Sequence, residues 1–219
     1  MNHIENNIPD HPPFSVCMIA RNEAKIIGQC LDALKALQCE LVVMDTGSTD
    51  DTVRIARSKD ANVFSYVWTD DFSAARNHVA ALAANDLILA VDADEVLTEY
   101  DIEAFSKAVC QNPASIGMIS RISPTLRGGV RQSFHERVGR FYDRTLFHYA
   151  GTIHENLTSR TPELGNSFYD LPLTFLHSGY EDQEKIREKA VRDLELLRKE
   201  LQTEGDSPYL LFASNGVCT

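Results

Sequence analysis

Three carboxylates directly follow an apolar run in the middle of the chain. The run Leu87–Val91 is unbroken, and Asp92, Asp94 and Glu95 come immediately after it. A short continuous apolar run is typical of a strand buried on both faces. Carboxylates this close repel one another unless a cation or a proton relieves them, and a divalent ion that also holds phosphate oxygens would do so. The alternative is a solvated acidic turn that opens a following helix.

Three further apolar segments precede this run, and helical patterns separate them. The predicted strands are Phe14–Ala20, Leu41–Met44 and Asn62–Val67. The predicted helices cover Ile26–Leu37, the segment around Val53–Ala56, and a stretch from a capping Ser73 to about Ala84. Gly47 permits a tight turn after the second strand, and Ser48 or Thr49 can cap the helix that follows. Alternating strands and helices predict an α/β fold with a mainly parallel sheet.

Each predicted strand ends in polar residues. These strand ends are Arg21 and Asn22, Asp45, Asp70 and Asp71, and finally Asp92 and Asp94. The carboxyl ends of parallel strands lie at one edge of a sheet, which is where ligands bind in open α/β folds. Four convergent polar loops therefore favour a binding crevice over a chance acidic turn.

Arginines recur in the second half of an otherwise acidic chain. They are Arg121, Arg127, Arg131, Arg137, Arg140 and Arg144, and we call residues 121–144 the arginine segment. The segment is either a solvated loop that balances neighbouring acids or a surface that faces an anionic substrate. Short strands are expected at Phe141–Tyr142, Thr145–Tyr149 and Leu171–Leu176, the last ending at His177.

The composition limits the partners and the compartment. A net charge of -11 disfavours binding to nucleic acid or to an anionic membrane surface. No apolar stretch approaches the ~20 residues of a membrane-spanning helix. The five cysteines are scattered without a C-x-x-C pair, and four of them lie in apolar surroundings typical of core residues. We expect a cytoplasmic protein, either free or peripheral at the inner face of the membrane.

The chain divides into three predicted parts. Residues 1–13 form a polar, flexible leader, residues 14–180 form the α/β domain, and residues 181–219 form a charged helical extension. The stripe of apolar residues from Ile186 to Leu197 and the break at Gly205–Pro208 are typical of a helical hairpin. We expect this extension to begin a helical repeat region that is cut short.

Six motifs in order resemble the family 2 glycosyltransferases. They are Met18–Glu23, Val43–Asp50, Trp68–Asn77, Val91–Glu95, Arg144–Phe147 and Ile153–Glu155. The resemblance covers roughly Phe14 to Tyr180 and implies the GT-A fold, a Rossmann-like, mainly parallel sheet flanked by helices. The subgroup resembled includes lipooligosaccharide β-glucosyltransferases and bacteriocin-glycosylating enzymes, often followed by tetratricopeptide helices.

The resemblance implies a metal-dependent, inverting transfer from a nucleoside diphosphate sugar, most simply UDP-linked. It implies that Asp45 contacts the base and that Asp92 lies on the ribose and metal side. Further residues that help to hold the nucleotide are Asp71, Arg76 and Asn77. Asp94 would ligate Mg²⁺ or Mn²⁺, and His177 is either a further metal ligand or a structural histidine. Arg21 stands where many relatives place an aromatic residue that stacks on the base, and its planar guanidinium could stack instead.

An inverting transfer also needs one base for the acceptor hydroxyl, because an alcohol is a poor nucleophile. The candidates are Glu155, Glu95 and, third, His154. Glu95 adjoins the expected metal ligands, and a nearby cation would weaken it as a base. Glu155 matches the His-Glu step of the family, and its alternative role is an ion pair with a nearby arginine. The acceptor itself stays open between a soluble glycan, a lipid-linked sugar and a peptide.

Three other functions compete with this interpretation. Asp92–Leu97 also fits the nucleophile motif of haloacid-dehalogenase-like phosphatases, but that motif usually opens the core domain, and here three strand–helix units precede it. An EF-hand loop is excluded because Val96 and Leu97 occupy its next ligand position and its glycine. A non-catalytic sugar-nucleotide-binding module is the third, and the intact acidic residues argue against it.

Overall fold

The computed structural model describes residues 11–127, 130–153 and 155–177, together with residues 191, 194 and 196. His154, most of the predicted leader and nearly all of the predicted helical extension lie outside these residues. His11, inside the predicted leader, is buried, and its Nε2 lies 2.8 Å from the carbonyl oxygen of Leu37. The packed part of the chain therefore includes residues before the first predicted strand.

One eight-stranded sheet organises the described residues, with the order β3-β2-β1-β4-β7-β6-β10-β5. Four neighbouring strands run parallel to one another: β1 (Ser15–Ala20), β2 (Glu40–Asp45), β3 (Asn62–Ser65) and β4 (Leu87–Ala90). The others are β5 (Glu95–Tyr100), β6 (Ile116–Arg127), β7 (Val130–Asp143) and β10 (Phe168–His177). A separate antiparallel pair consists of β8 (Phe147–Ala150) and β9 (Asn156–Ser159).

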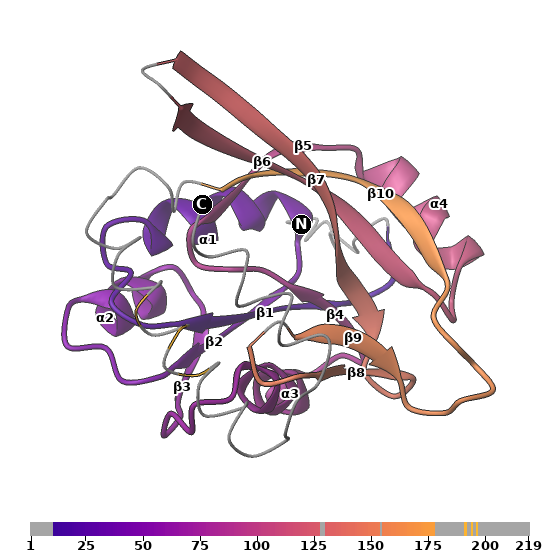
Figure 1. Ribbon diagram of the computed structural model, residues 1–219, viewed down its shortest axis with the longest axis horizontal. Coiled ribbons are helices and arrows are strands. Elements are labelled where there is room, and N and C mark those ends of the chain that lie inside the picture. Colours follow the sequence, from indigo (N-terminus) through magenta and orange to yellow (C-terminus); the bar gives the residue numbers. More distant parts are fainter. Residues whose placement is uncertain are drawn as a thin grey trace, which may run out of the picture.

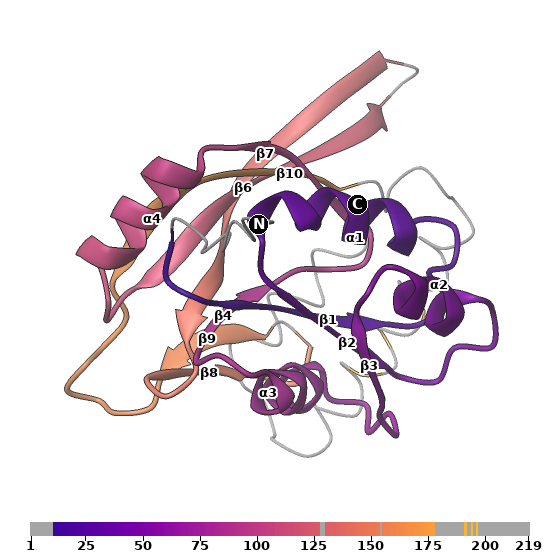
Figure 2. The same cartoon turned by 180° about the vertical axis from the view of Figure 1, so that it is seen from behind.

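Helices and the small β8–β9 pair cover the two faces of the sheet, which gives three layers (Figure 1). The helices are α1 (Ile27–Leu34, continued by a 3-10 turn at Lys35–Leu37), α2 (Thr52–Ser58), α3 (Phe72–Leu82) and α4 (Ile102–Gln111). On one face, α1 and α4 bury Leu31 and Phe105 against the sheet. On the other face, α3 and β8 bury Val79 and Phe147 (Figure 2). The predicted α/β class is confirmed.

Several local predictions are corrected by the structure. Asp71, not Ser73, caps α3, because its carboxylate accepts the backbone N–H of Ala74 at 2.8 Å. Asp51 occupies the N-cap position of α2 in place of Ser48 or Thr49. The residues after Asp94 continue as strand β5 instead of opening a helix, so the solvated-turn hypothesis is wrong.

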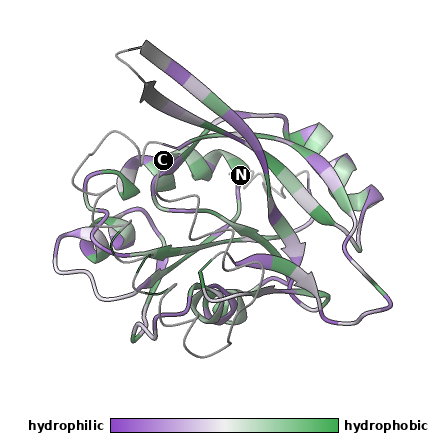
Figure 3. Cartoon of the chain, viewed as in Figure 1, coloured by the Kyte–Doolittle hydropathy of each residue, from purple (hydrophilic) through white to green (hydrophobic). Residues whose placement is uncertain are grey.

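The arginine segment is neither a loop nor a set of short strands. It lies on β6 and β7, two long antiparallel strands whose far ends project from the body of the molecule (Figures 1 and 2). Strand β7 is hydrophilic along much of its length, whereas the central strands are mostly hydrophobic (Figure 3). Pairing of β4 with β7 sets Leu89 opposite Phe141. Arg140 therefore lies beside the end of β4, next to the acidic residues.

The cysteines are only partly core residues. Cys17 and Cys30 are buried, Cys39 is half-buried, Cys110 is exposed on α4, and Cys218 lies outside the described residues. Four core cysteines were predicted without naming which, and among the described residues two, Cys17 and Cys30, are fully buried. None of the helices described is long and apolar enough to cross a membrane.

Candidate functional site

The loops after β1 and β2 are held together by side-chain hydrogen bonds. Asn22, at φ +55°, accepts the backbone N–H of Thr49 at 2.8 Å through its Oδ1. The backbone N–H of Glu23 donates to Oγ1 of Thr52 at 2.8 Å. These contacts fix one side of the crevice before any ligand is present.

Asp45 closes the turn at the end of β2. Its carboxylate accepts the backbone N–H of Ser48 at 3.1 Å and that of Gly47 at 3.3 Å, and Gly47 has φ +104°. The side chain is nevertheless at the sheet edge predicted for it, with Arg21 exposed in the neighbouring loop. The assignment of both residues to the base of a nucleotide stays a prediction.

Asp92 lies at the centre of the site, between two arginines. Its Oδ1 accepts Nη2 of Arg76 at 2.7 Å, and its Oδ2 accepts Nη2 of Arg140 at 2.6 Å. Both arginine side chains are only 7% exposed. Burial alone would raise the pKa of Asp92, but the two guanidiniums outweigh it and hold that pKa well below its usual range. Asp92 is therefore a carboxylate whose charge is already compensated.

Glu95 is the most deeply buried acid of the cluster, with no exposed side-chain surface. Its Oε1 accepts Nη1 of Arg121 at 3.1 Å and Nη2 of Arg140 at 3.3 Å. Its Oε2 accepts the backbone N–H of Asp92 at 3.1 Å. These bonds engage both oxygens, so Glu95 holds the loop after β4 in shape.

Arg76 links Asp92 to Glu155, another of the predicted candidate bases. Its Nε donates to Oε1 of Glu155 at 2.7 Å, and its guanidinium carbon lies 5.3 Å from the centre of the Tyr149 ring. Asn77, the next residue, donates to the backbone carbonyl of Tyr149 at 2.8 Å and accepts its N–H at 2.9 Å. Helix α3 and strand β8 are thereby fixed to each other, and Glu155 keeps a side-chain exposure of 15%.

Asp71 and Ser73 tie the start of α3 to the loop before Glu155. The Ser73 hydroxyl donates to the carbonyl of Gly151 at 2.5 Å, while Asp71 caps the helix. The backbone N–H of Phe72 donates to the carbonyl of Thr152 at 3.0 Å. The motif Trp68–Asn77 therefore positions the loop that carries Glu155.

Asp94 and His177 face each other at the edge of the site. Asp94 is 7% exposed, and its Oδ2 lies 3.4 Å from Nε2 of His177, whose Nδ1 lies 3.3 Å from the hydroxyl of Ser123. A carboxylate is a suitable ligand for Mn²⁺ or Mg²⁺, whereas an imidazole suits a transition metal such as Mn²⁺ better than Mg²⁺. No group of three or more His, Cys, Asp or Glu side chains with metal-binding geometry occurs in the part of the chain that the structure describes. Phosphate oxygens and water would have to complete the coordination.

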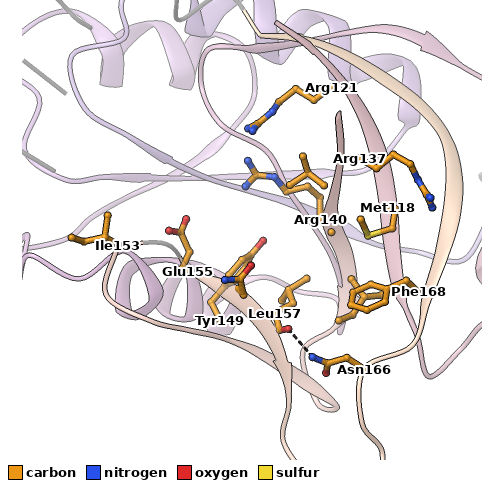
Figure 4. Close-up of a pocket in the computed structure, with 14 residues that line it drawn as sticks. Met118, Arg121, Arg137, Arg140, Tyr149, Ile153, Glu155, Leu157, Asn166 and Phe168 are labelled. Atoms are coloured by element: carbon orange, nitrogen blue, oxygen red, sulfur yellow. Dashed lines mark hydrogen bonds between the residues drawn. The ribbon is translucent and has the colours of Figure 1, made fainter. Parts of the chain in front are cut away.

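A cavity of about 590 Å³ opens beside this cluster (Figure 4). Glu155 and Tyr149 line one side of it, and Met118 and Phe168 lie across from them. Arg140 is shared between the cavity and the ion pairs on Asp92. The cavity and the acidic strand end therefore form one continuous site.

Most of the predicted site residues meet here, and three important ones were not assigned. Asp92, Asp94, Glu95, Arg76, Glu155 and His177 come together, whereas Asp45 and Arg21 lie along the same edge on other loops. No site role was predicted for Arg140, Arg121 or Tyr149. The arginine recurrence was the available signal for the first two, and nothing in the sequence marked Tyr149.

Comparisons with known proteins agree with this geometry. The family model for Glycosyl transferase family 2 matches residues 15–163. The glycosyltransferase SunS of Bacillus subtilis is 30% identical over 214 residues, which covers 93% of this chain and 48% of SunS. A TPR repeat-containing protein of Synechococcus elongatus is 38% identical over 143 residues, covering 64% of this chain and 34% of its own length. The chain thus spans about half or less of these relatives.

Solved structures share the fold. S. aureus TarS in complex with UDP-GlcNAc has a TM-score of 0.56 at 17% identity, covering 91% of this chain and 69% of that one. Glucosyl-3-phosphoglycerate synthase from Mycobacterium tuberculosis, in complex with Mn²⁺, UDP and glucosyl-3-phosphoglycerate, has a TM-score of 0.54 at 18% identity. The structural match covers 87% of this chain and 79% of the synthase chain. These similarities confirm the GT-A fold.

Replacing Glu95 by Gln should destabilise the fold. The variant leaves Arg121 and Arg140 with a neutral partner in a buried position, and we expect the free energy of unfolding to fall by about 3 kcal/mol. Urea denaturation measures the change. Glu163→Gln is the control, since Glu163 is exposed and should tolerate the change. Equal stability of the two variants would contradict a structural role for Glu95.

The stability contributed by Asp92 should depend on pH. Because its folded pKa is lowered, the contribution is complete above the unfolded value of about 3.9 and is lost as the pH falls toward the folded value. We therefore expect the wild type to be more stable than Asp92→Asn at pH 7, with the difference shrinking below about pH 4. Denaturation curves at several pH values check this. A difference that is constant or grows in acid would contradict it.

Proposed function

We propose that this chain, which belongs to glycosyl transferase family 2, transfers a sugar from a UDP-linked donor to an acceptor hydroxyl with inversion. The observation that carries the proposal is the compensated Asp92 at the end of β4, with Asp94 beside it and a cavity adjoining it. TarS has been solved in complex with UDP and with UDP-GlcNAc, and glucosyl-3-phosphoglycerate synthase in complex with UDP and Mn²⁺. These ligands support a UDP-linked donor. Family membership leaves the phosphatase hypothesis without support.

The metal would be held by Asp94 and His177, completed by donor phosphate oxygens. When bound, Mg²⁺ or Mn²⁺ supplies electrostatic stabilisation of the departing diphosphate. Each oxygen of Asp92 accepts one arginine N–H group and keeps a second lone pair, but the two positive guanidiniums beside it oppose the approach of a metal ion. We infer that Asp92 acts on the metal side mainly by orienting these two guanidiniums.

The nucleotide would lie along the edge formed by β1, β2 and α3. Asp45 and Arg21 are placed to approach a base there. Asp71 and Asn77 use their side chains on the cap of α3 and on the backbone of Tyr149, so we infer that they position the nucleotide site without touching the ligand. Among Asp71, Arg76 and Asn77, Arg76 is the one with a positive charge that could contact the donor phosphates.

Glu155 is the proposed base. It lines the cavity and is partly exposed, whereas Glu95 is enclosed by two arginines and a backbone N–H. Glu155 would take the proton from the acceptor hydroxyl as that oxygen attacks the anomeric carbon, and the bond to the diphosphate breaks with its electron pair leaving on UDP. Arg76 orients the carboxylate through its 2.7 Å bond. His154 lies outside the described residues.

UDP should bind more tightly in the presence of Mn²⁺, and Asp94→Ala should remove that enhancement. The variant loses one of the two side chains available to the metal, so its UDP affinity should be the same with and without the ion. Isothermal titration calorimetry with UDP, with and without Mn²⁺, measures both values. Glu163→Ala is a control for removing an exposed carboxylate. A folded wild type that binds no UDP in either condition would refute the donor proposal.

Glu155→Gln should leave UDP binding intact and slow turnover. The amide keeps the shape of the side chain but cannot accept a proton, so we expect kcat to fall on the order of 100-fold. UDP release from UDP-linked sugars, with simple glycosides or water as acceptor, gives the rate. Normal turnover in Glu155→Gln together with an inactive but folded Glu95→Gln would transfer the base to Glu95. A wild type that binds UDP and turns over none of the donors would favour the non-catalytic module.

A further inference from the structure

The cavity beside Glu155 contains buried polar atoms that lack partners. Among the described residues, Nε of Arg140 and the hydroxyl of Tyr149 have no hydrogen-bond partner. The two residues are only 6% and 4% exposed, and both line the cavity (Figure 4). A buried donor or acceptor without a partner costs about 1–3 kcal/mol. Both atoms have almost no accessible surface, so a ligand that presents oxygen atoms here recovers that cost only if the two side chains rotate slightly toward the cavity.

The arginines that line the cavity already have carboxylate partners and need no anionic ligand. Each arginine of the arginine segment whose side chain the structure describes is paired with a carboxylate. The pairs are Arg121 with Glu95 and Glu136, Arg137 with Asp170, Arg140 with Asp92 and Glu95, and Arg144 with Asp86. Glu155, the carboxylate that lines the cavity, is likewise paired, with Arg76. The anionic-substrate interpretation of this segment therefore loses its basis for these four residues.

One part of the cavity wall is apolar and ends in an exposed aromatic ring, while Asn156 and Asn166 add amide groups to the wall. Ile116, Met118, Val138 and Leu157 line the cavity, and Phe168 lines it while 59% exposed. A volume of about 590 Å³ lies within the usual range of small-ligand sites, roughly 300–1,000 Å³. A sugar ring has one face of C–H groups and a rim of hydroxyls. The apolar wall matches the face, and Arg140, Tyr149 and Glu155 match the rim.

We propose that this cavity is the acceptor site and that it takes a neutral sugar ring in preference to an anionic one. The ring lies against Phe168 and Met118, and its hydroxyls meet Nε of Arg140 and the hydroxyl of Tyr149 once a small side-chain rotation opens these two enclosed atoms to the cavity. One hydroxyl then faces Glu155. The inference rests on the proposed function, because it takes Glu155 as the base that faces the acceptor.

The test compares neutral and anionic methyl glycosides as probes. The probes are the methyl glycosides of glucose, galactose, N-acetylglucosamine and glucuronic acid, and ligand-observed NMR on the full 219-residue chain measures their binding, with and without UDP and Mn²⁺. We expect at least one neutral glycoside to bind, and the glucuronide to bind at least about tenfold more weakly, because its charge finds no free cation. A glucuronide that binds as tightly as the neutral probes, or binding of no glycoside at all, would overturn the proposal.

Variants locate the binding site of the probe. Phe168→Ala should weaken the neutral glycoside roughly five- to tenfold through the lost ring contact. Phe134→Ala is the matched control, since Phe134 is 60% exposed on the same sheet and does not line the cavity. Tyr149→Phe should weaken binding roughly three- to tenfold through the lost hydroxyl. Equal effects of Phe168→Ala and Phe134→Ala would place the glycoside outside the cavity and refute the proposal.

Two further comparisons separate this inference from the proposed function. UDP binding is measured on the same samples by calorimetry. Binding of UDP without binding of any glycoside would refute only the acceptor-site proposal. Binding of a glycoside without binding of UDP would refute the donor proposal. If a UDP-linked sugar displaces the glycoside and UDP alone does not, the cavity holds the sugar of the donor, and the acceptor assignment is wrong.

Discussion

The ion pairs of Asp92 with Arg76 and Arg140 are the interaction on which the rest of the site depends. Asp92 comes from the end of β4, Arg76 from α3 and Arg140 from β7, so one carboxylate joins three elements that are far apart in sequence. All three side chains are largely buried, where a charge without a partner is strongly unfavourable. The mutual compensation keeps the loop after β4 in one conformation.

This arrangement also connects the two halves of the site. Arg76 holds Asp92 with one nitrogen and Glu155 with another, while Asn77 fixes the backbone of Tyr149. The donor side and the acceptor side thus share helix α3. A single guanidinium, that of Arg76, therefore contacts both Asp92 and Glu155.

The sequence predicted the parts of the fold that local patterns determine. Strands β1 to β4 and helix α1 follow from apolar runs and helical periodicity, and the acidic residues after β4 follow from the strand end. The pairing of β7 beside β4 is a long-range contact with no local signal. Hence Arg140 could be noticed as one of several arginines but not assigned to Asp92. Tyr149 was missed for the same reason, because its role comes from burial beside Arg76.

The charge balance of the site explains why a cation and a diphosphate are expected together. The guanidiniums of Arg76, Arg121 and Arg140 face five carboxylates, those of Asp92, Asp94, Glu95, Glu136 and Glu155. Counting these carboxylates and guanidiniums alone, the excess is two negative charges, and a diphosphate by itself would add two more. One divalent ion carried with the diphosphate adds no net charge, so the repulsion that would oppose the nucleotide disappears. The same excess is consistent with the proposed preference of the adjoining cavity for a neutral acceptor.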